Sequence, residues 1–232
     1  MRRGAELARA LAGDFKVVSY DRRGRGDSGD ARPYAVEREF EDLRAVITAA
    51  GSDENACVHA VSSGGALVLR AIAAGIRIRK ASIFEAPYRI EGAPAMPENY
   101  IATLEGFVDA DDRAGLVEYF NTRVIGLPIE VLESMKGTPM WEALEAIAPT
   151  LVYDGLALGG DDQSLPVGML GGVDVPVLAI SSDQTTPWLR DAARALSEAI
   201  PKGEHLSLAG GFHEVPPAML APVLAEFYGK EE

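Results

Sequence analysis

The sequence is poor in features that would direct it out of the cytoplasm. Its 232 residues include a single cysteine, Cys57, so no disulfide can form within the chain, and we expect a buried, inert thiol there. No apolar run approaches the roughly 20 residues that a membrane-spanning helix needs. Residues 1–13 begin with two arginines but continue as an amphipathic helix, without the apolar stretch of a signal peptide. These absences predict a cytoplasmic protein.

Positive charge is also scarce. There are 22 Lys and Arg against 35 Asp and Glu, a net charge of −13, which argues against a nucleic-acid partner because phosphate backbones bind basic surfaces. The 47% hydrophobic and 25% charged content is typical of a globular protein. The length allows one domain with a substantial core and an inserted subdomain.

Two patterns suggest a bound cofactor at first sight. The glycine-rich turn at residues 24–29 has dinucleotide-like spacing, but Pro33 delays the helix that should follow directly. Acidic runs at 109–112 and 159–163 lack histidine and regular ligand spacing. We therefore predict neither a cofactor nor a metal.

Short β-rich runs alternate with longer helical ones along most of the chain. This alternation predicts an α/β fold, with a mostly parallel sheet covered by helices on both faces. Strands are expected at 15–21, 56–62, 80–87, 175–183 and 204–210, and helices at 1–13, 37–51, 64–75, 186–200 and 216–228.

The middle of the chain breaks this rhythm. Residues 89–172 are helical in periodicity, punctuated by Pro and Gly, and contain no convincing strand. We therefore expect a core formed by residues 1–88 and 173–232 and a helical cap at 89–172. An excursion of this kind would lie over the carboxyl ends of the strands, where α/β sheets bind ligands. A helical appendage that only stabilises the fold is the alternative.

A candidate nucleophile lies in the stretch HAVSSGGALVLR, residues 59–70. A strand, a small-x-Ser-x-Gly pattern from Ala60 to Gly64 and a helix follow one another, as in a nucleophile elbow. The register selects Ser62 as the nucleophile, in strained backbone geometry, and directs the backbone N–H of Ser63 toward a developing oxyanion. Ala60 stands where glycine is usual. A Ser/Gly turn that merely caps the helix is the alternative.

Serine needs a general base, and there are three histidines. His59 and His205 fall inside expected strands, where they would be packed in the sheet. His213 follows the last expected strand in the loop LAGGFHEVPP, just before the last helix. A base that reaches across strand ends belongs there, so we predict His213.

The acid is less clear. In a fold of this kind it usually follows the strand expected at 175–183, but Thr185 occupies the corresponding position and Asp183 comes two residues early. The preceding strand ends at Glu85, a carboxylate that is costly to bury without a partner. We favour Glu85 as the acid and keep Asp183 as the alternative.

The ordered motifs YDRRGRGDSG, AVSSGGALVLRA, IFEAPY, PWLRDAARAL and GGFHEVPP resemble the α/β-hydrolase fold, in particular small bacterial serine hydrolases with a helical cap. The resemblance covers nearly the whole chain except the cap. Haloalkane dehalogenases of this fold carry an acid at the place of Glu85, but their nucleophile is aspartate. Ser62 therefore points to acyl transfer.

The resemblance also implies strands and a His-Gly loop before the first helix, and that loop supplies the second oxyanion N–H. No such turn precedes the helix at residues 1–13. We expect either that the sequence starts late or that the oxyanion hole lacks one donor. The sheet should then have an exposed edge that could pair with another chain, and a homodimer is possible.

These observations predict a serine hydrolase, an esterase-like enzyme that cleaves a small, largely apolar ester, thioester, lactone or amide. Ser62, His213 and Glu85 would form its catalytic triad, and water would release the acyl group. The alternative is a catalytically impaired or non-catalytic protein of the same fold that binds a small ligand or a partner under its cap. A cofactor-free lyase or isomerase is a third, lesser possibility.

Overall fold

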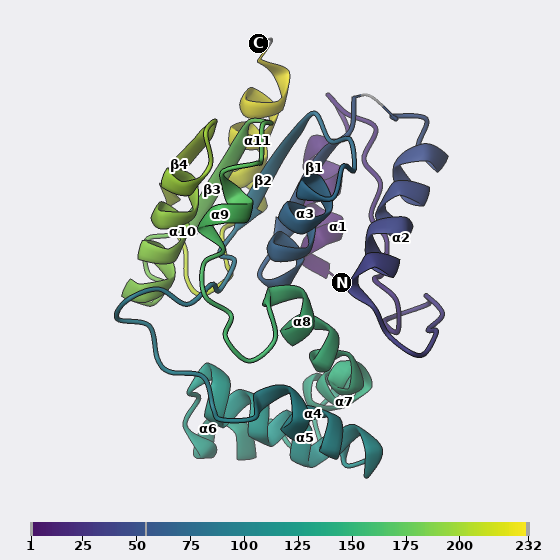
Figure 1. Cartoon of the computed structure of the whole chain (residues 1–232), viewed down its shortest axis with the longest axis vertical. Helices are drawn as coiled ribbons and strands as arrows, with labels where there is room; N and C mark the ends of the chain where they lie inside the picture. Colours follow the sequence, from purple (N-terminus) through teal and green to yellow (C-terminus); the bar gives the residue numbers. More distant parts are fainter. Residues whose placement is uncertain (1, 54, 231–232) are drawn as a thin grey trace. The chain divides into compact units, whose positions relative to one another are not determined.

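The computed structural model describes residues 2–53 and 55–230 (Figure 1). The described residues form two compact units. The sheet unit contains the residues up to Tyr20, Glu37–Ala93 and those from Ser164 onward, and the helical unit contains Asp21–Val36 and Pro94–Gln163. The helical unit is thus shorter at both ends than the cap expected at 89–172, and it also contains the loop Asp21–Val36, for which the sequence predicts a place in the core.

Four parallel strands form the sheet: β1 Cys57–Val61, β2 Lys80–Phe84, β3 Val177–Ser182 and β4 Gly203–Leu208, in the order β1-β2-β3-β4. Each pairs with its neighbour in register, with Val61 opposite Phe84 and Phe84 opposite Ile180. β2 and β3 are buried throughout, whereas β1 and β4, at the edges, are partly exposed. These four strands confirm four of the five strand predictions.

Helices cover both faces of the sheet. On one face lie α3 Ser63–Ala73 and α10 Pro187–Ala199, which α9 Val167–Leu170 joins by contacting both. On the other lie α1 Arg2–Leu11 and α11 Pro217–Gly229, packed against each other. Successive side chains of β2 point to the two faces of the sheet. Ile83 faces α3, and its neighbour Phe84 belongs to the core cluster that includes α11. The predicted α/β architecture is confirmed.

The strand predicted at 15–21 is wrong. Residues 16–22 form no regular structure, and Val18 is 49% exposed, with Val17 and Tyr20 also on the surface. An apolar run becomes a strand only where a neighbour receives its backbone hydrogen bonds. Among the described residues β1 pairs with β2 alone, so this segment does not pair with the free edge of β1.

A chain of buried hydroxyls fastens α11 to the sheet. Tyr228 Oη donates to the backbone carbonyl of Val58 at 3.0 Å and lies 2.6 Å from Ser82 Oγ, which lies 2.7 Å from His59 Nδ1. Since the carbonyl can only accept, the Tyr228 proton points to it, Ser82 donates to Tyr228, and His59 donates from Nδ1 to Ser82. The chain thereby assigns one tautomer to His59.

The helical unit has its own core. Its helices are α4 Tyr100–Asp109, α5 Arg113–Tyr119, α6 Ile129–Glu133, α7 Pro139–Ile147 and α8 Leu151–Leu158, with a π-helical segment at Phe120–Ile125 and a 3-10 turn at Ala148–Thr150. Leu104, Leu116, Leu132 and Trp141 are buried among them. Its described residues contain helices and no strand, as the periodicity of the middle section predicts.

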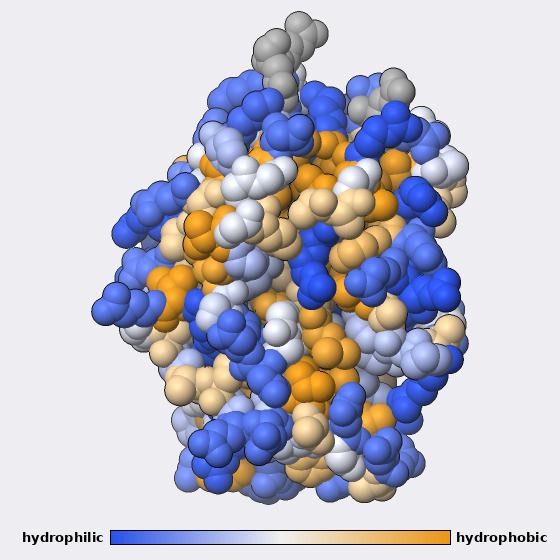
Figure 2. Space-filling view, in the orientation of Figure 1, coloured by the Kyte–Doolittle hydropathy of each residue, from blue (hydrophilic) through white to orange (hydrophobic). Residues whose placement is uncertain are grey.

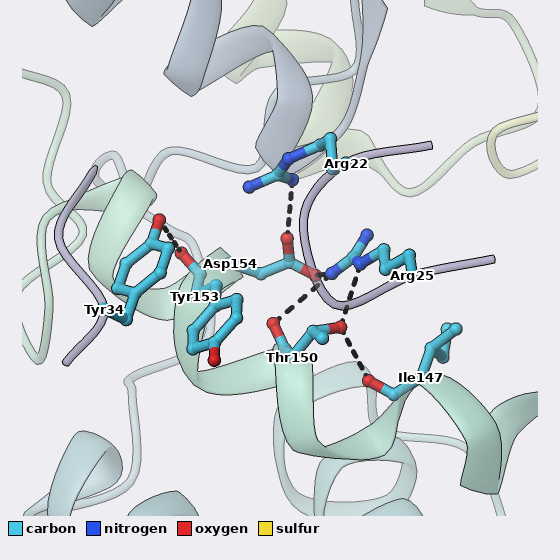
Figure 3. A network of polar contacts seen from close by, with 7 residues as sticks. All are labelled: Arg22, Arg25, Tyr34, Ile147, Thr150, Tyr153 and Asp154. Carbon is cyan, nitrogen blue, oxygen red and sulfur yellow. Dashed lines mark hydrogen bonds and ion pairs between the residues drawn. The ribbon is translucent and has the colours of Figure 1, made fainter. Parts of the chain in front are cut away.

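The loop before α2 Val36–Ala49 is fastened to α8 within the helical unit (Figure 3). Arg22 Nη1 donates to one carboxylate oxygen of Asp154 at 2.8 Å, and Arg25 Nη2 donates to the other at 2.6 Å. Further along the loop, the ring of Tyr34 stacks on that of Tyr153, with centroids 3.9 Å apart. These contacts explain why the glycine-rich turn belongs to the helical unit.

Figure 2 shows the hydropathy of one face of the molecule. On the face drawn in Figure 2, hydrophilic residues spread widely and hydrophobic ones show between them. No helix within the described part of the chain is both long and apolar enough to cross a membrane.

Candidate active site

Three side chains singled out by the sequence follow strands at the carboxyl edge of the sheet. Ser62 follows β1, Glu85 follows β2, and His213 lies in the loop between β4 and α11. The ladder continues one step past the strands, because Ser62 N–H donates to Phe84 O at 2.9 Å and Glu85 N–H donates to Ile180 O at 3.0 Å. Parallel strands in register thus bring these residues to one edge, where α/β sheets bind ligands.

The turn at Ser62 has the geometry of a nucleophile elbow. Ser62 has φ 57° and ψ −133°, between the end of β1 and the start of α3, which confirms the strained backbone that the motif predicts. The unusual Ala60 fits: a Cβ built on Gly64 would lie 3.9 Å from Ala60 Cβ, an ordinary contact. Ser63 is the first residue of α3, so its N–H lies at the positive end of the helix.

Glu85 is a fully buried carboxylate, with a side-chain exposure of 0%. Its Oε1 accepts from Ser182 N–H at 2.9 Å and lies 2.6 Å from Ser182 Oγ, whose single proton also faces the backbone carbonyl of Gly211. Its Oε2 accepts from His213 N–H at 2.8 Å. Four polar contacts, counting the His213 ring, therefore surround a charge that would otherwise be costly to bury.

The His213 ring completes this set. Nδ1 lies 2.8 Å from Glu85 Oε2, close enough for an ion pair, although the ring is turned out of line for a good hydrogen bond. Burial raises the pKa of Glu85, but the contacts with His213 and Ser182 lower it by more, so that the net pKa lies below the usual value. Glu85 is therefore ionised at neutral pH.

A tight turn presents His213. Gly211 N–H donates to Glu214 O at 2.8 Å and Glu214 N–H donates to Gly211 O at 3.0 Å, so Phe212 and His213 are the two central residues. His213 has φ 49°, in a position where turns with positive φ usually carry glycine or asparagine.

Backbone strain is concentrated at this edge. Among the described residues, six other than glycine have positive φ, and Ser62, Glu85 and His213 are three of them. Conformations of this kind cost roughly 1–3 kcal/mol each and cluster at functional sites. The strain is therefore an indication of function that does not depend on the motif.

Asp183, the alternative acid, lies elsewhere. Its Oδ1 accepts from Gly210 N–H at 3.0 Å, and its own side chain is exposed. It braces the base of the loop that carries His213 and does not contact the imidazole. The structure brings Glu85 to His213 and leaves Asp183 apart.

The other two histidines are held within the sheet. His59 is bonded to Ser82 as described, and burial lowers its pKa to about 4. His205 Nε2 lies 3.0 Å from Ser181 Oγ, and burial together with the charge of Arg194 lowers its pKa. Both are neutral at pH 7 and bonded to serines of neighbouring strands.

Ser62 and His213 are not joined by a hydrogen bond in the part of the chain that the structure describes. Hydrogen bonds between a nucleophile and its base are often long before substrate binds and tighten in the complex.

Ser182 was not singled out from the sequence, although its backbone N–H donates to Glu85 and its hydroxyl lies 2.6 Å from the carboxylate. A signal was present, because two serines, Ser181 and Ser182, end a strand that is buried throughout. What the sequence lacked was the pairing of β3 with β2, which makes Ser182 a neighbour of Glu85.

A strained serine turn at the same sheet edge as a buried carboxylate–histidine pair defines the class as an α/β hydrolase. Among solved structures, the chain is similar to an alpha/beta hydrolase from Sphaerobacter thermophilus DSM 20745, with 40% identity and a TM-score of 0.88, over 97% of this chain and 86% of that chain. No curated protein matches.

More distant structures share the fold. A bromoperoxidase from Bacillus anthracis is 22% identical with a TM-score of 0.69, over 99% of this chain and 87% of that one. An esterase, RhEst1, from Rhodococcus sp. ECU1013 is 19% identical with a TM-score of 0.62, over 97% and 84%. The model of the Alpha/beta hydrolase family matches residues 2–222. The chain therefore belongs to the alpha/beta hydrolase family, and this membership places it among the hydrolases.

Proposed function

We propose that this hydrolase uses Ser62 as a nucleophile to cleave a small, largely apolar ester, thioester, lactone or amide. The observation that carries the proposal is the buried carboxyl group of Glu85 beside the His213 ring, at the sheet edge where Ser62 is held in strained geometry. A charge buried against a histidine at this position has a chemical use, because it orients a general base.

The reaction begins when His213 Nε2 accepts the hydroxyl proton of Ser62 as Oγ attacks the substrate carbonyl carbon. The carbonyl oxygen becomes an oxyanion, which the backbone N–H of Ser63 stabilises at the start of α3. His213 then gives its proton to the leaving group, and an acyl ester remains on Ser62. Water attacks this ester with the same proton movements and restores the free serine.

Glu85 acts through the histidine. Its carboxylate faces Nδ1 at 2.8 Å, so the Nδ1-protonated tautomer is favoured and Nε2 keeps the lone pair that takes the serine proton. When His213 becomes an imidazolium, the negative charge of Glu85 stabilises it.

A fluorophosphonate probe tests the proposal, because only an activated serine displaces its fluoride. We expect the wild-type protein to be labelled, with the label mapped to Ser62 and not to the adjacent Ser63. Ser62→Ala should abolish labelling, whereas the control Ser207→Ala, at an exposed serine of β4, should not. An unlabelled wild type, or a label that persists in Ser62→Ala, would refute the nucleophile and favour a non-catalytic binding protein.

A further inference from the structure

The aromatic ring of Phe212 lies directly against His213. The two ring centroids are 4.1 Å apart with an angle of 38° between the planes, and Phe212 is 47% exposed. A single exposed apolar side chain is ordinary on a protein surface. This one differs in its place, because it is in contact with the proposed general base.

The turn holds Phe212 in this place. Both central residues of the Gly211–Glu214 turn carry rings, and the two backbone hydrogen bonds between Gly211 and Glu214 limit how far they can separate. Phe84 approaches the imidazole more remotely, edge-on at 6.2 Å, and is buried in the core. Of the two phenylalanines, Phe212 is the one with surface to offer a ligand.

The direction of proton transfer says which part of a substrate would reach Phe212. Nδ1 of His213 faces Glu85, so Nε2 must give the proton to the leaving group. Transfer requires the leaving oxygen to come within about 2.6–3.2 Å of Nε2. The Phe212 ring, whose centroid is 4.1 Å from that of the imidazole, is then within reach of the group attached to the leaving oxygen.

We propose that Phe212 determines the specificity of this site for the leaving group and favours esters whose alcohol portion is aromatic. Such a group packs against the exposed ring of Phe212 while its oxygen takes the proton from His213. Two aromatic rings in contact gain free energy in addition to that from the apolar area they bury. An ethyl group in the same place lacks this additional contribution. This inference rests on the proposed serine hydrolase function and adds the substrate class to it.

The test compares benzyl acetate with ethyl acetate, which share the acyl group and have alkoxide leaving groups. We expect Phe212→Ala to lower kcat/KM for benzyl acetate by about tenfold and that for ethyl acetate by less than about twofold, the difference one aromatic contact makes. Phe212→Tyr, which keeps the ring, should retain the wild-type ratio of the two substrates. Met219→Ala, at a 43% exposed side chain of α11, is the matched control and should change neither.

Three results would overturn the inference alone. In the first, Phe212→Ala slows both esters equally, which would mean that Phe212 only positions His213. In the second, Phe212→Ala slows neither ester. In the third, the fluorophosphonate labels Ser62 of the wild type, but the wild type does not hydrolyse benzyl acetate. By contrast, Ser62→Ala that hydrolyses both esters at the wild-type rate, or a wild type with neither turnover nor label, would overturn the proposed function itself.

Discussion

Replacing Glu85 with glutamine tests the buried carboxylate at nearly constant size. Both of its oxygens receive a backbone N–H, from Ser182 at Oε1 and from His213 at Oε2. An amide has only one oxygen, so its NH₂ must face one of these two N–H groups, and two donors cannot form a hydrogen bond with each other. Glu85→Gln therefore leaves a buried donor unsatisfied in either orientation, at a cost of about 1–3 kcal/mol in the free energy of unfolding.

The same substitution should nearly abolish turnover. If the NH₂ occupies the Oε2 site, it donates to His213 Nδ1 and moves the ring proton to Nε2, which can then no longer take the Ser62 proton. In the other orientation the imidazolium still loses its counter-charge. We expect kcat to fall by about 10³–10⁴-fold, the order found when the carboxylate of such a triad is replaced by its amide.

The pH dependence of stability gives a second readout. Because the pKa of Glu85 is lowered in the folded state, its charge stabilises the fold above the unfolded pKa, and this contribution is lost as pH falls through the folded pKa. The stability difference between wild type and Glu85→Gln should therefore be largest at neutral pH and shrink below about pH 4.3.

Urea unfolding at pH 7 and pH 3.5, with ester hydrolysis at pH 7, measures both effects. Asp183→Asn is the matched control, because asparagine keeps the Oδ1 that accepts from Gly210 N–H. It should retain wild-type turnover. A fully active Glu85→Gln, or an Asp183→Asn that loses activity, would refute Glu85 as the acid.

Two further predictions concern the sheet unit. Gly65→Ala should lower the free energy of unfolding in urea by about 1–3 kcal/mol, because its Cβ would lie 2.5 Å from Ile83 Cγ2. Gly64→Ala, whose Cβ would make only an ordinary contact, should cost clearly less. Equal losses for the two variants would contradict the close approach of α3 to β2. Tyr228→Phe removes the hydroxyl between Ser82 and the sheet backbone and should cost about 1–3 kcal/mol, with the fluorophosphonate labelling rate unchanged. A Tyr228→Phe variant with the same free energy of unfolding as the wild type would mean that this chain of hydroxyls does not fasten α11.

The features that depend on local chemistry could be predicted from the amino-acid sequence. The strand–serine–helix pattern predicted the strained turn at Ser62, because small residues on both sides are a local requirement of that turn. Period-2 and period-3.6 patterns predicted four strands and the helices around them. His213 stood out because it was the one histidine outside an expected element.

The features that depend on neighbours far apart in the chain could not be predicted from the sequence. The apolar run at 15–21 satisfies the local criteria of a strand, yet it is irregular, because it pairs with none of the strands in the described sheet. The proximity of Glu85 to His213, with Asp183 apart, follows from sheet order and from the turn after β4. Backbone pairing between distant segments sets these positions, and no window of the sequence contains both partners of such a pair.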